Sequence, residues 1–323
     1  MSEPLLVIEG LDVRYDGERP LHAIAGLHLQ LDAGESLGLL GESGSGKTQL
    51  LLAILGLAPR AARISGSIRF RGQELTGGGA AAVRGTQIGM VFQDPLQALN
   101  PYLTVGTQLT EALREHRGVG WRQARERALK LLLDVQIAEP GRRLAQYPHQ
   151  LSGGMRQRVL IAMAMIGEPA LLLCDEPTTA LDVTVQAQVL QLLAQLQAQT
   201  GCALMVVTHD LAVLTTLAER VAVMYAGRMV EHAPVGALRA AMHPYTRGLQ
   251  RSALPPGPAA TVWPTIAGQP PDLRTLPPGC AFAPRCDRRL QRCVVETPEL
   301  VARAARRAVA CHNPAPVGDP STS

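Results

Sequence analysis

Eight residues near the start of the chain have the types and the spacing needed to hold a phosphate chain. Gly41 to Thr48 read GESGSGKT and match the P-loop pattern G-x-x-x-x-G-K-[ST] at every fixed position. Glycines let the backbone curl so that successive N–H groups point at phosphate oxygens. The Lys47 ammonium would neutralise the β- and γ-phosphates, and the Thr48 hydroxyl would bind Mg²⁺. The expected nucleotide contacts in this loop are Gly41, Ser43, Gly44, Ser45, Gly46, Lys47 and Thr48.

Two adjacent carboxylates follow a second apolar run. Asp175 and Glu176 come directly after Leu171 to Cys174, about 125 residues beyond the P-loop. In a Walker B strand the first carboxylate holds Mg²⁺ through its outer shell, and the second orients or deprotonates the attacking water. An acidic pair at a strand end can also be a solvated turn. The distance from the P-loop and the following Pro177-Thr178-Thr179 favour the Walker B interpretation.

Two other positions suit phosphate contacts. Ser152, Gly153 and Gly154 precede a predicted helix, whose N-terminus would bind an anion beside the Ser152 hydroxyl. His209 follows the predicted strand Ala203 to Val207. A lone histidine is usually a packing or surface residue, but ligands bind at the carboxyl ends of strands in a doubly wound nucleotide-binding fold. We therefore expect His209 to contact the γ-phosphate.

Alternating strands and helices must position these side chains. The apolar strand Leu37 to Leu40 leads into the P-loop, and the helical run Gln49 to Leu57 leaves it. Other strands are predicted at Leu5 to Tyr15, Leu27 to Leu31, Ile64 to Arg71 and Ile88 to Phe92. Helices are predicted within residues 101–134 and at Gly153 to Ile166 and Val185 to Leu196. Tyr15 could stack on the adenine base or simply pack at its strand end.

Composition limits the class of protein. The 323 residues are 46% hydrophobic, which fits a globular chain with a large core. No apolar run reaches the ~18 residues of a membrane span, and the N-terminus lacks the basic region of a signal peptide. The net charge of +4 is too small to indicate nucleic acid as a partner. We expect a cytosolic chain, in which cysteines hold metals or stay reduced.

The last 70 residues differ from the rest of the chain. Leu254 to Pro278 contain eight prolines and predict an extended linker. Four cysteines follow with the spacing C-x5-C-x6-C-x17-C, at Cys280, Cys286, Cys293 and Cys311. They could ligate an iron–sulfur cluster or zinc, or remain free thiols. Arg285, Arg288, Arg289 and Arg292 lie between them and could lower the thiol pKa values or keep the tail in solution. Cys174 and Cys202 are expected in the core.

These motifs together resemble the ATP-binding-cassette family over about Leu5 to Glu231. Position by position, Gly41 to Thr48 look like Walker A, Gln93 like the Q-loop glutamine, Leu151 to Met155 like the signature, Asp175 and Glu176 like Walker B and the catalytic glutamate, Ala180 to Asp182 like the D-loop, and His209 like the switch histidine. Met155 departs from the commonest signature, which ends in Gln. The resemblance implies an α/β fold with a P-loop NTPase core, an antiparallel β subdomain and a helical signature subdomain, plus the Cys-containing C-terminal extension.

The resemblance also implies roles for these residues. Lys47, Gln93, Glu176 and His209 would be catalytic. Mg²⁺ would be held by Thr48, Gln93 and Asp175. Two cassettes of this family pair head to tail, so Ser152, Gly153 and Gly154 would serve the ATP of a partner cassette, which is either a copy or a paralogue.

A narrower resemblance covers nearly the whole chain. Val91 to Pro95, Leu99 to Pro101, Ser152 to Arg158, His243 to Thr246 and the tail are similar to ATPase subunits of bacterial oligopeptide/dipeptide importers. It implies a peripheral subunit on the cytoplasmic face of the inner membrane, two permease subunits and a periplasmic or extracellular substrate-binding protein. It also implies a cassette over residues 1–253, an extension over 254–323, and a [4Fe–4S] cluster on the tail cysteines.

Three alternatives compete with a peptide importer. Nickel importers of the same branch look alike through the cassette, so another small solute is the first alternative. Soluble cassette ATPases of DNA repair or ribosomes usually carry a large insertion or tandem cassettes, and neither is present. A catalytically dead regulatory subunit is disfavoured, because Lys47, Glu176 and His209 are intact.

Overall fold

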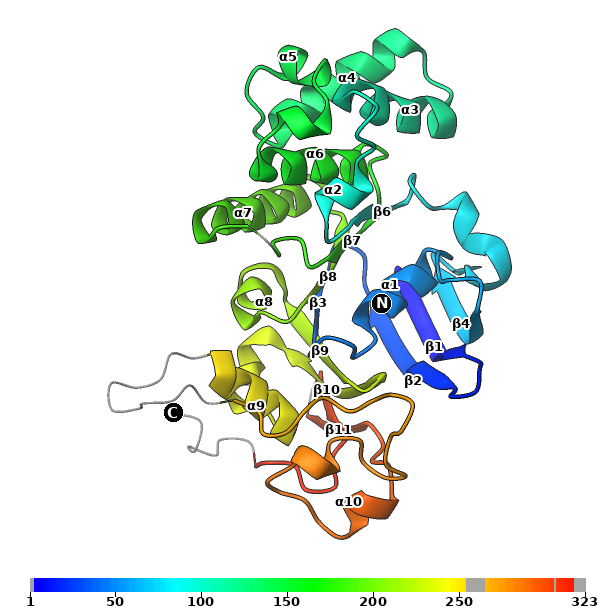
Figure 1. Cartoon of the computed structure of the whole chain (residues 1–323), viewed down its shortest axis with the longest axis vertical. Coiled ribbons are helices and arrows are strands. Elements are labelled where there is room, and N and C mark those ends of the chain that lie inside the picture. The colour runs from blue at the N-terminus through cyan, green and yellow to red at the C-terminus, as the bar shows by residue number, and fades with distance from the viewer. Residues whose placement is uncertain (1–2, 180, 254–264, 305, 317–323) are drawn as a thin grey trace. The chain divides into compact units, whose positions relative to one another are not determined.

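The computed structural model describes residues 3–179, 181–253, 265–304 and 306–316 (Figure 1). The chain divides into two compact units. The first, which we call the P-loop unit, comprises Met1–Gln30, Leu37–Gly77 and Thr208–Ser323. The second, the helical unit, comprises Leu31–Ser36 and Gly78–Val207. The expected boundary at residue 253 lies within the P-loop unit and stays a prediction.

A four-stranded sheet forms one part of the P-loop unit. Its strand order is β2 (Leu21–Leu31), β1 (Leu6–Tyr15), β4 (Ala62–Phe70) and β5 (Gln73–Glu74). The β1–β4 and β4–β5 pairs are antiparallel. Buried residues alternate in each half of β1, at Leu6 and Ile8 and again at Leu11 and Val13, on either side of a register shift between Glu9 and Asp12. This sheet confirms the expected antiparallel β layer.

A second set of strands in this unit carries the P-loop. Strand β3 (Ser36–Leu40) pairs in parallel with β9 (Arg220–Tyr225), and the order continues through β10, β12 and β11, which pair antiparallel. The other elements of the unit are α1 (Lys47–Ile54), α8 (Leu211–Leu217), β10 (Arg228–Pro234), η3 (Val235–Ala240), α9 (Pro244–Ala253), η4 (Ala283–Arg285), α10 (Arg292–Val295), β11 (Val301–Ala304) and β12 (Arg307–Val309). The C-terminal residues therefore add strands to the sheet that contains β3.

The helical unit has a parallel core of three strands. These are β6 (Ile88–Val91), β7 (Leu171–Asp175) and β8 (Ala203–Thr208). Every residue of β7 is buried, which explains its continuous apolar sequence. The helices are α2 (Pro95–Ala98), α3 (Val105–Arg117), α4 (Trp121–Asp134), α5 (Pro140–Leu144), η2 (Pro148–Gln150), α6 (Gly153–Met165) and α7 (Val183–Thr200), and η1 (Thr76–Ala82) leads into the unit.

Most predicted elements lie within a few residues of the observed ones, and three differ. Strand β2 begins at Leu21 rather than Leu27, because consecutive burial of residues 23–25 breaks the alternation used to find it. Helix α1 begins at Lys47 rather than Gln49, since the last motif residues form its first turn. Residues 101–134 form two helices, with Gly118 closing the first. The predicted apolar face of α4 is confirmed by the burial of Ala124, Ala128 and Leu132.

The Pro-rich stretch is only partly described. Residues 254–264 lie outside the described residues, and residues 265–278 contain no helix or strand, as predicted. Ile266, Leu273 and Leu276 nevertheless pack against a buried cluster that includes Tyr225 and Tyr245. This part of the linker is therefore fixed to the P-loop unit. Within the described parts of the chain, no helix combines the length and apolar character needed to span a membrane.

Candidate functional site

The P-loop lies between β3 and α1, in the strand–loop–helix context that the motif requires. Gly46 has φ +101°, and a side chain there would collide with the carbonyl oxygen of Ala23. A side chain at Gly41 would collide with the carbonyl oxygen of Met224. Close backbone approach therefore demands glycine at both positions. Ser43, Gly44 and Thr48 are exposed at the loop surface.

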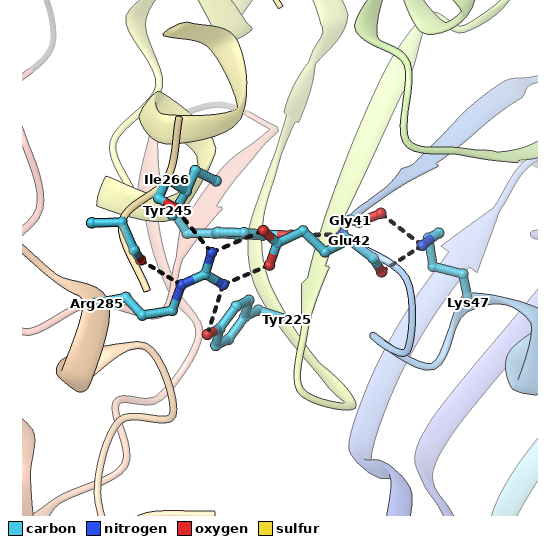
Figure 2. A network of polar contacts seen from close by, with 8 residues as sticks. Gly41, Glu42, Lys47, Tyr225, Tyr245, Ile266 and Arg285 are labelled. Atoms are coloured by element: carbon cyan, nitrogen blue, oxygen red, sulfur yellow. Dashed lines mark hydrogen bonds and ion pairs between the residues drawn. The ribbon is translucent and has the colours of Figure 1, made fainter. Parts of the chain in front are cut away.

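The Lys47 ammonium is held by the loop itself. Its side chain is buried, and Nζ donates to the carbonyl oxygens of Gly41 at 2.7 Å and Glu42 at 2.9 Å (Figure 2). A third contact reaches the Ser45 hydroxyl at 3.2 Å. These acceptors compensate the desolvation of a buried cation. An ammonium held this way can exchange carbonyl oxygens for phosphate oxygens.

Tyr15 lies beside the first turn of α1. Its hydroxyl donates to Oε1 of Gln49 at 2.6 Å, and its ring is partly buried. Burial raises the Tyr15 pKa, and the Gln49 hydrogen bond offsets part of that rise. The contact fixes the ring near the P-loop helix. The adenine role of Tyr15 stays a prediction.

In the helical unit, three side chains meet where β6 and β7 end. Gln93 Nε2 donates to Oε2 of Glu176 at 3.2 Å, and the Thr179 hydroxyl donates to the same oxygen at 2.8 Å. Asp175 is the buried last residue of β7. Glu176 has φ +45°, an unfavourable left-handed conformation for a residue with a side chain. The structure thus orients the Glu176 carboxylate by two donors on a strained backbone.

Thr179 was not among the predicted site residues. Its backbone N–H also donates to the Glu176 carbonyl oxygen at 3.2 Å, so residues 176–179 form a hydrogen-bonded turn. The sequence does contain a feature that could have indicated this contact. Thr179 lies three positions after Glu176, in a Pro-Thr-Thr sequence that favours a turn.

The signature residues open α6 as predicted. Ser152 is the N-cap, and its hydroxyl accepts from the Met155 N–H at 3.3 Å. A cavity of about 500 Å³ adjoins this helix N-terminus, and its lining includes Arg143, Arg158 and Asp182. The Nε atom of Arg143 is buried and has no hydrogen-bond partner among the described residues. Two guanidinium groups beside a helix N-terminus suit an anionic ligand.

Asp182 and His209 occupy the ends of two elements. The Asp182 carboxylate caps α7 by accepting from the Val185 N–H at 2.9 Å, whereas Ala180 lies outside the described residues. His209 directly follows β8 and is exposed. The structure brings Gln93, Asp175 and Glu176 together in one unit. It places Lys47, Thr48 and His209 in the other.

Cys293 of the tail is buried and the other three cysteines are partly buried, and the Cys280 N–H donates to the Cys293 carbonyl oxygen at 2.8 Å. Burial raises the pKa of Cys311 to about 11, and the thiols of Cys280, Cys286 and Cys293 contribute to that rise. Burial likewise raises the pKa values of Cys280 and Cys286. Backbone N–H groups donate to two of the sulfurs, from Leu290 to Cys293 and from Asn313 to Cys311, both at 3.4 Å.

The expected cluster ligands are not assembled as a metal site in this structure. Throughout the described residues, no group of three or more histidine, cysteine or acidic side chains is placed to hold a metal ion. Cys280, Cys286, Cys293 and Cys311 are all free thiols. Cys174 and Cys202 are buried, which confirms the prediction that they are core residues.

Family models match two parts of the chain. The model described as ABC transporter matches residues 24–179. The model described as oligopeptide/dipeptide transporter, C-terminal region, matches residues 230–293. The second match includes the first three tail cysteines and ends before Cys311.

Curated relatives match nearly the whole chain. The oligopeptide transport ATP-binding protein OppD of Mycobacterium tuberculosis is 47% identical over 317 residues, which cover 95% of this chain and 52% of the relative. The chain thus spans about half the length of that protein. A putative peptide import ATP-binding protein of Brucella abortus is 45% identical over 318 residues, covering 93% of this chain and 94% of the relative.

Solved structures share the fold. The ATP-binding cassette MJ0796, a dimer bound to ADP and phosphate, has a TM-score of 0.64 at 30% identity, covering 71% of this chain and 98% of its own. The cbiO1 protein of Clostridium perfringens, part of an ABC transporter complex, has a TM-score of 0.61 at 26% identity, with 72% and 90% covered. The expected P-loop NTPase fold is confirmed. The chain therefore belongs to the ATP-binding proteins of the ABC transporter family, in the branch that carries the oligopeptide/dipeptide transporter C-terminal region.

Proposed function

We propose that this chain is the ATP-hydrolysing subunit of a bacterial importer that takes up dipeptides or oligopeptides across the inner membrane. One observation carries the proposal. A single chain combines an intact P-loop, a strand-end glutamate oriented by Gln93, and a C-terminal region matched by a model named for peptide transporters. The relatives named for peptide import support the same solute class.

We assign these side chains the following tasks in ATP hydrolysis. Lys47 and the backbone N–H groups of Gly44 to Thr48 bind the β- and γ-phosphates. Glu176 accepts a proton from the attacking water, and Gln93 and Thr179 hold its carboxylate in place. His209 contacts the γ-phosphate. The P-loop and the Glu176 carboxylate lie in different compact units. That both act on the same ATP molecule is inferred from the family resemblance.

Magnesium fits the donors that this chain offers. The Thr48 hydroxyl, the Gln93 amide and the Asp175 carboxylate are the hard oxygen ligands that Mg²⁺ prefers. Bound Mg²⁺ neutralises charge that develops on the phosphates during transfer. Asp175 is the buried last residue of β7, and ligands bind at the carboxyl ends of strands in open α/β sheets.

An importer ATPase of this kind works with a second cassette, permease subunits and a substrate-binding protein. The Ser152 helix N-terminus, with Arg143 and Arg158 beside it, would contact the ATP of a second cassette. Two permease subunits would anchor the pair at the cytoplasmic face of the membrane, and a substrate-binding protein would deliver the peptide. Phe92 precedes Gln93, Leu96 and Tyr102 follow it, and all three side chains are exposed. These exposed apolar and aromatic side chains support a permease contact in this segment.

We further propose a [4Fe–4S] cluster on the four tail cysteines. Two contacts join the cysteine-bearing segments: the Cys280 N–H donates to the Cys293 carbonyl oxygen at 2.8 Å, and the Asn313 side-chain amide donates to the Arg288 carbonyl oxygen at 3.0 Å. N–H donors directed at two of the sulfurs also support the cluster, because cluster sulfurs accept such hydrogen bonds. Loading requires the thiols to close around the cluster, since they do not form a metal site without it. Anaerobically purified protein should be brown, absorb near ~400 nm and contain about four irons per chain. Colourless, iron-free protein would rule the cluster out.

Purification from membranes tests the transport assignment. The tagged chain, extracted in mild detergent, should bring down two polytopic membrane proteins and a cassette subunit. Crosslinks from a photoreactive group at Tyr102 should reach the permeases, because its side chain is 87% exposed. A chain that is recovered only with cytosolic proteins would contradict the proposal.

A further inference from the structure

The second residue of the P-loop is held by the C-terminal part of the chain. The Glu42 backbone N–H donates to the Tyr245 hydroxyl at 2.7 Å, across 203 residues of sequence. The Glu42 carboxylate forms a two-point ion pair with Arg285, 243 residues away, with N–O distances of 2.7 Å and 3.0 Å (Figure 2). Parallel hydrogen bonds of this kind fix geometry as well as charge.

Arg285 is itself rigidly placed. Its side chain is 5% exposed, and its Nε atom donates to the Ala267 carbonyl oxygen at 2.9 Å. The guanidinium also donates to the Tyr225 hydroxyl at 3.3 Å. Phe282, at the start of the same turn, packs edge-on against Tyr225 with ring centroids 5.2 Å apart. The position of the guanidinium thus depends on how the tail folds onto β9.

The contact continues to the phosphate-binding lysine. The carbonyl oxygen of Glu42 accepts from Lys47 Nζ at 2.9 Å, so one residue links the tail arginine to the P-loop ammonium (Figure 2). Glu42 would otherwise present a negative charge in a loop built to bind a polyanion. An uncompensated carboxylate on this loop would repel a bound polyanion.

We propose that Arg285 is a positioning residue of the nucleotide site. By neutralising and fixing Glu42, it keeps the P-loop in its ATP-binding form, so the folded state of the C-terminal region sets the affinity for ATP. The inference rests on the proposed ATPase function and adds a way in which the C-terminal region regulates ATP binding. Because Arg285 immediately precedes Cys286, any change that unfolds the cysteine region is transmitted to the P-loop.

The test uses the full-length chain and MgATP, with affinity measured by calorimetry and turnover by phosphate release. Arg285→Ala should weaken ATP binding about tenfold and raise KM with little change in kcat, since it leaves an unpaired carboxylate in the loop. Adding Glu42→Gln to Arg285→Ala should restore affinity to within about threefold of the wild-type value. Rescue by removal of the carboxylate would show that the lost affinity comes from the unpaired charge of Glu42.

Two variants complete the design. Arg292→Ala is the matched control, because Arg292 is an exposed tail arginine whose ion pair is with Glu296, and it should bind ATP normally. Arg285→Lys keeps one charge without the two-point contact, and its affinity should lie between those of wild type and Arg285→Ala. It also serves if the alanine variant does not fold.

The outcomes separate the two hypotheses. Normal ATP affinity in Arg285→Ala or Arg285→Lys would overturn the inference and leave the ATPase function intact. A double variant no better than Arg285→Ala would reduce Arg285 to a structural residue of the tail. Wild-type protein that fails to bind MgATP would overturn both.

Discussion

Replacement of Tyr245 by phenylalanine removes a single oxygen from the support of the P-loop. Tyr245 is fully buried, and its hydroxyl accepts the hydrogen bond of the Glu42 backbone N–H at 2.7 Å. Its ring lies 4.6 Å from that of Tyr225 and 5.4 Å from that of Phe282, measured between centroids. Phenylalanine preserves these ring contacts, so the packing energy should not change.

The expected cost is that of an amide without its acceptor. Leaving a buried donor unsatisfied costs about 1–3 kcal/mol. Glu42 is only half-buried, so we expect water to compensate part of this and the loss in unfolding free energy to be about 1–2 kcal/mol. Burial raises the pKa of Tyr245 above its ordinary value, so the hydroxyl stays neutral and the loss should be the same at pH 6 and pH 8.

Urea denaturation of the full-length chain measures this loss. Tyr245→Phe should lower the midpoint without changing the slope of the transition, because the surface exposed on unfolding is the same. Tyr102→Phe is the control, since that tyrosine is 87% exposed and should leave the midpoint unchanged. A Tyr245→Phe midpoint equal to that of the wild type would refute the reasoning that the hydroxyl supports the loop.

Three further predictions concern the chemistry. Glu176→Gln should keep ATP binding and slow hydrolysis by ~10²–10⁴-fold, whereas Lys47→Ala should weaken binding itself; radiolabelled ATP turnover and filter binding separate the two, and normal turnover in Glu176→Gln would contradict the role of the base. Gly153→Asp should fold normally, because a side chain there meets nothing within 4 Å. It should block ATP-driven dimerisation, measured by light scattering, without changing the ATP affinity of its own P-loop. A loss of ATP affinity at its own P-loop as large as the loss of dimerisation would argue against a role in the partner's site. Zinc, used as a probe, should bind the iron-free tail more tightly as pH rises from 6 to 8. Burial raises the thiol pKa values, to about 11 for Cys311, so the thiols are protonated in this range and metal binding must release their protons. A zinc affinity that does not change with pH would show that the cysteines are not the ligands.

Local patterns account for what the sequence predicted well. The P-loop, strand β7 with Asp175 and Glu176, and the Ser152 helix start are each encoded within about ten consecutive residues. Motif spacing, continuous hydrophobicity and N-cap preference identify such features without knowledge of the tertiary fold. The start of β2 was misplaced because its burial does not alternate.

The features that the sequence could not predict depend on contacts between residues far apart in the chain. Glu42 occupies a variable position of the P-loop pattern, and its partners lie 203 and 243 residues away. Arg285 was expected only to influence the thiols or keep the tail in solution, yet it forms an ion pair with the P-loop glutamate. The Gln93–Glu176 contact likewise joins residues 83 positions apart, although each was predicted as a site residue separately. Such pairs depend on strand order, which no local pattern encodes.

Uptake of a labelled tripeptide by cells tests the central claim most directly. Deletion of the gene for this chain should abolish uptake, and wild-type protein should restore it. Glu176→Gln, expressed at the same level and binding ATP normally, should not restore it. Undiminished uptake in the deletion strain, or full restoration by Glu176→Gln, would contradict the account of an ATP-hydrolysing peptide import subunit.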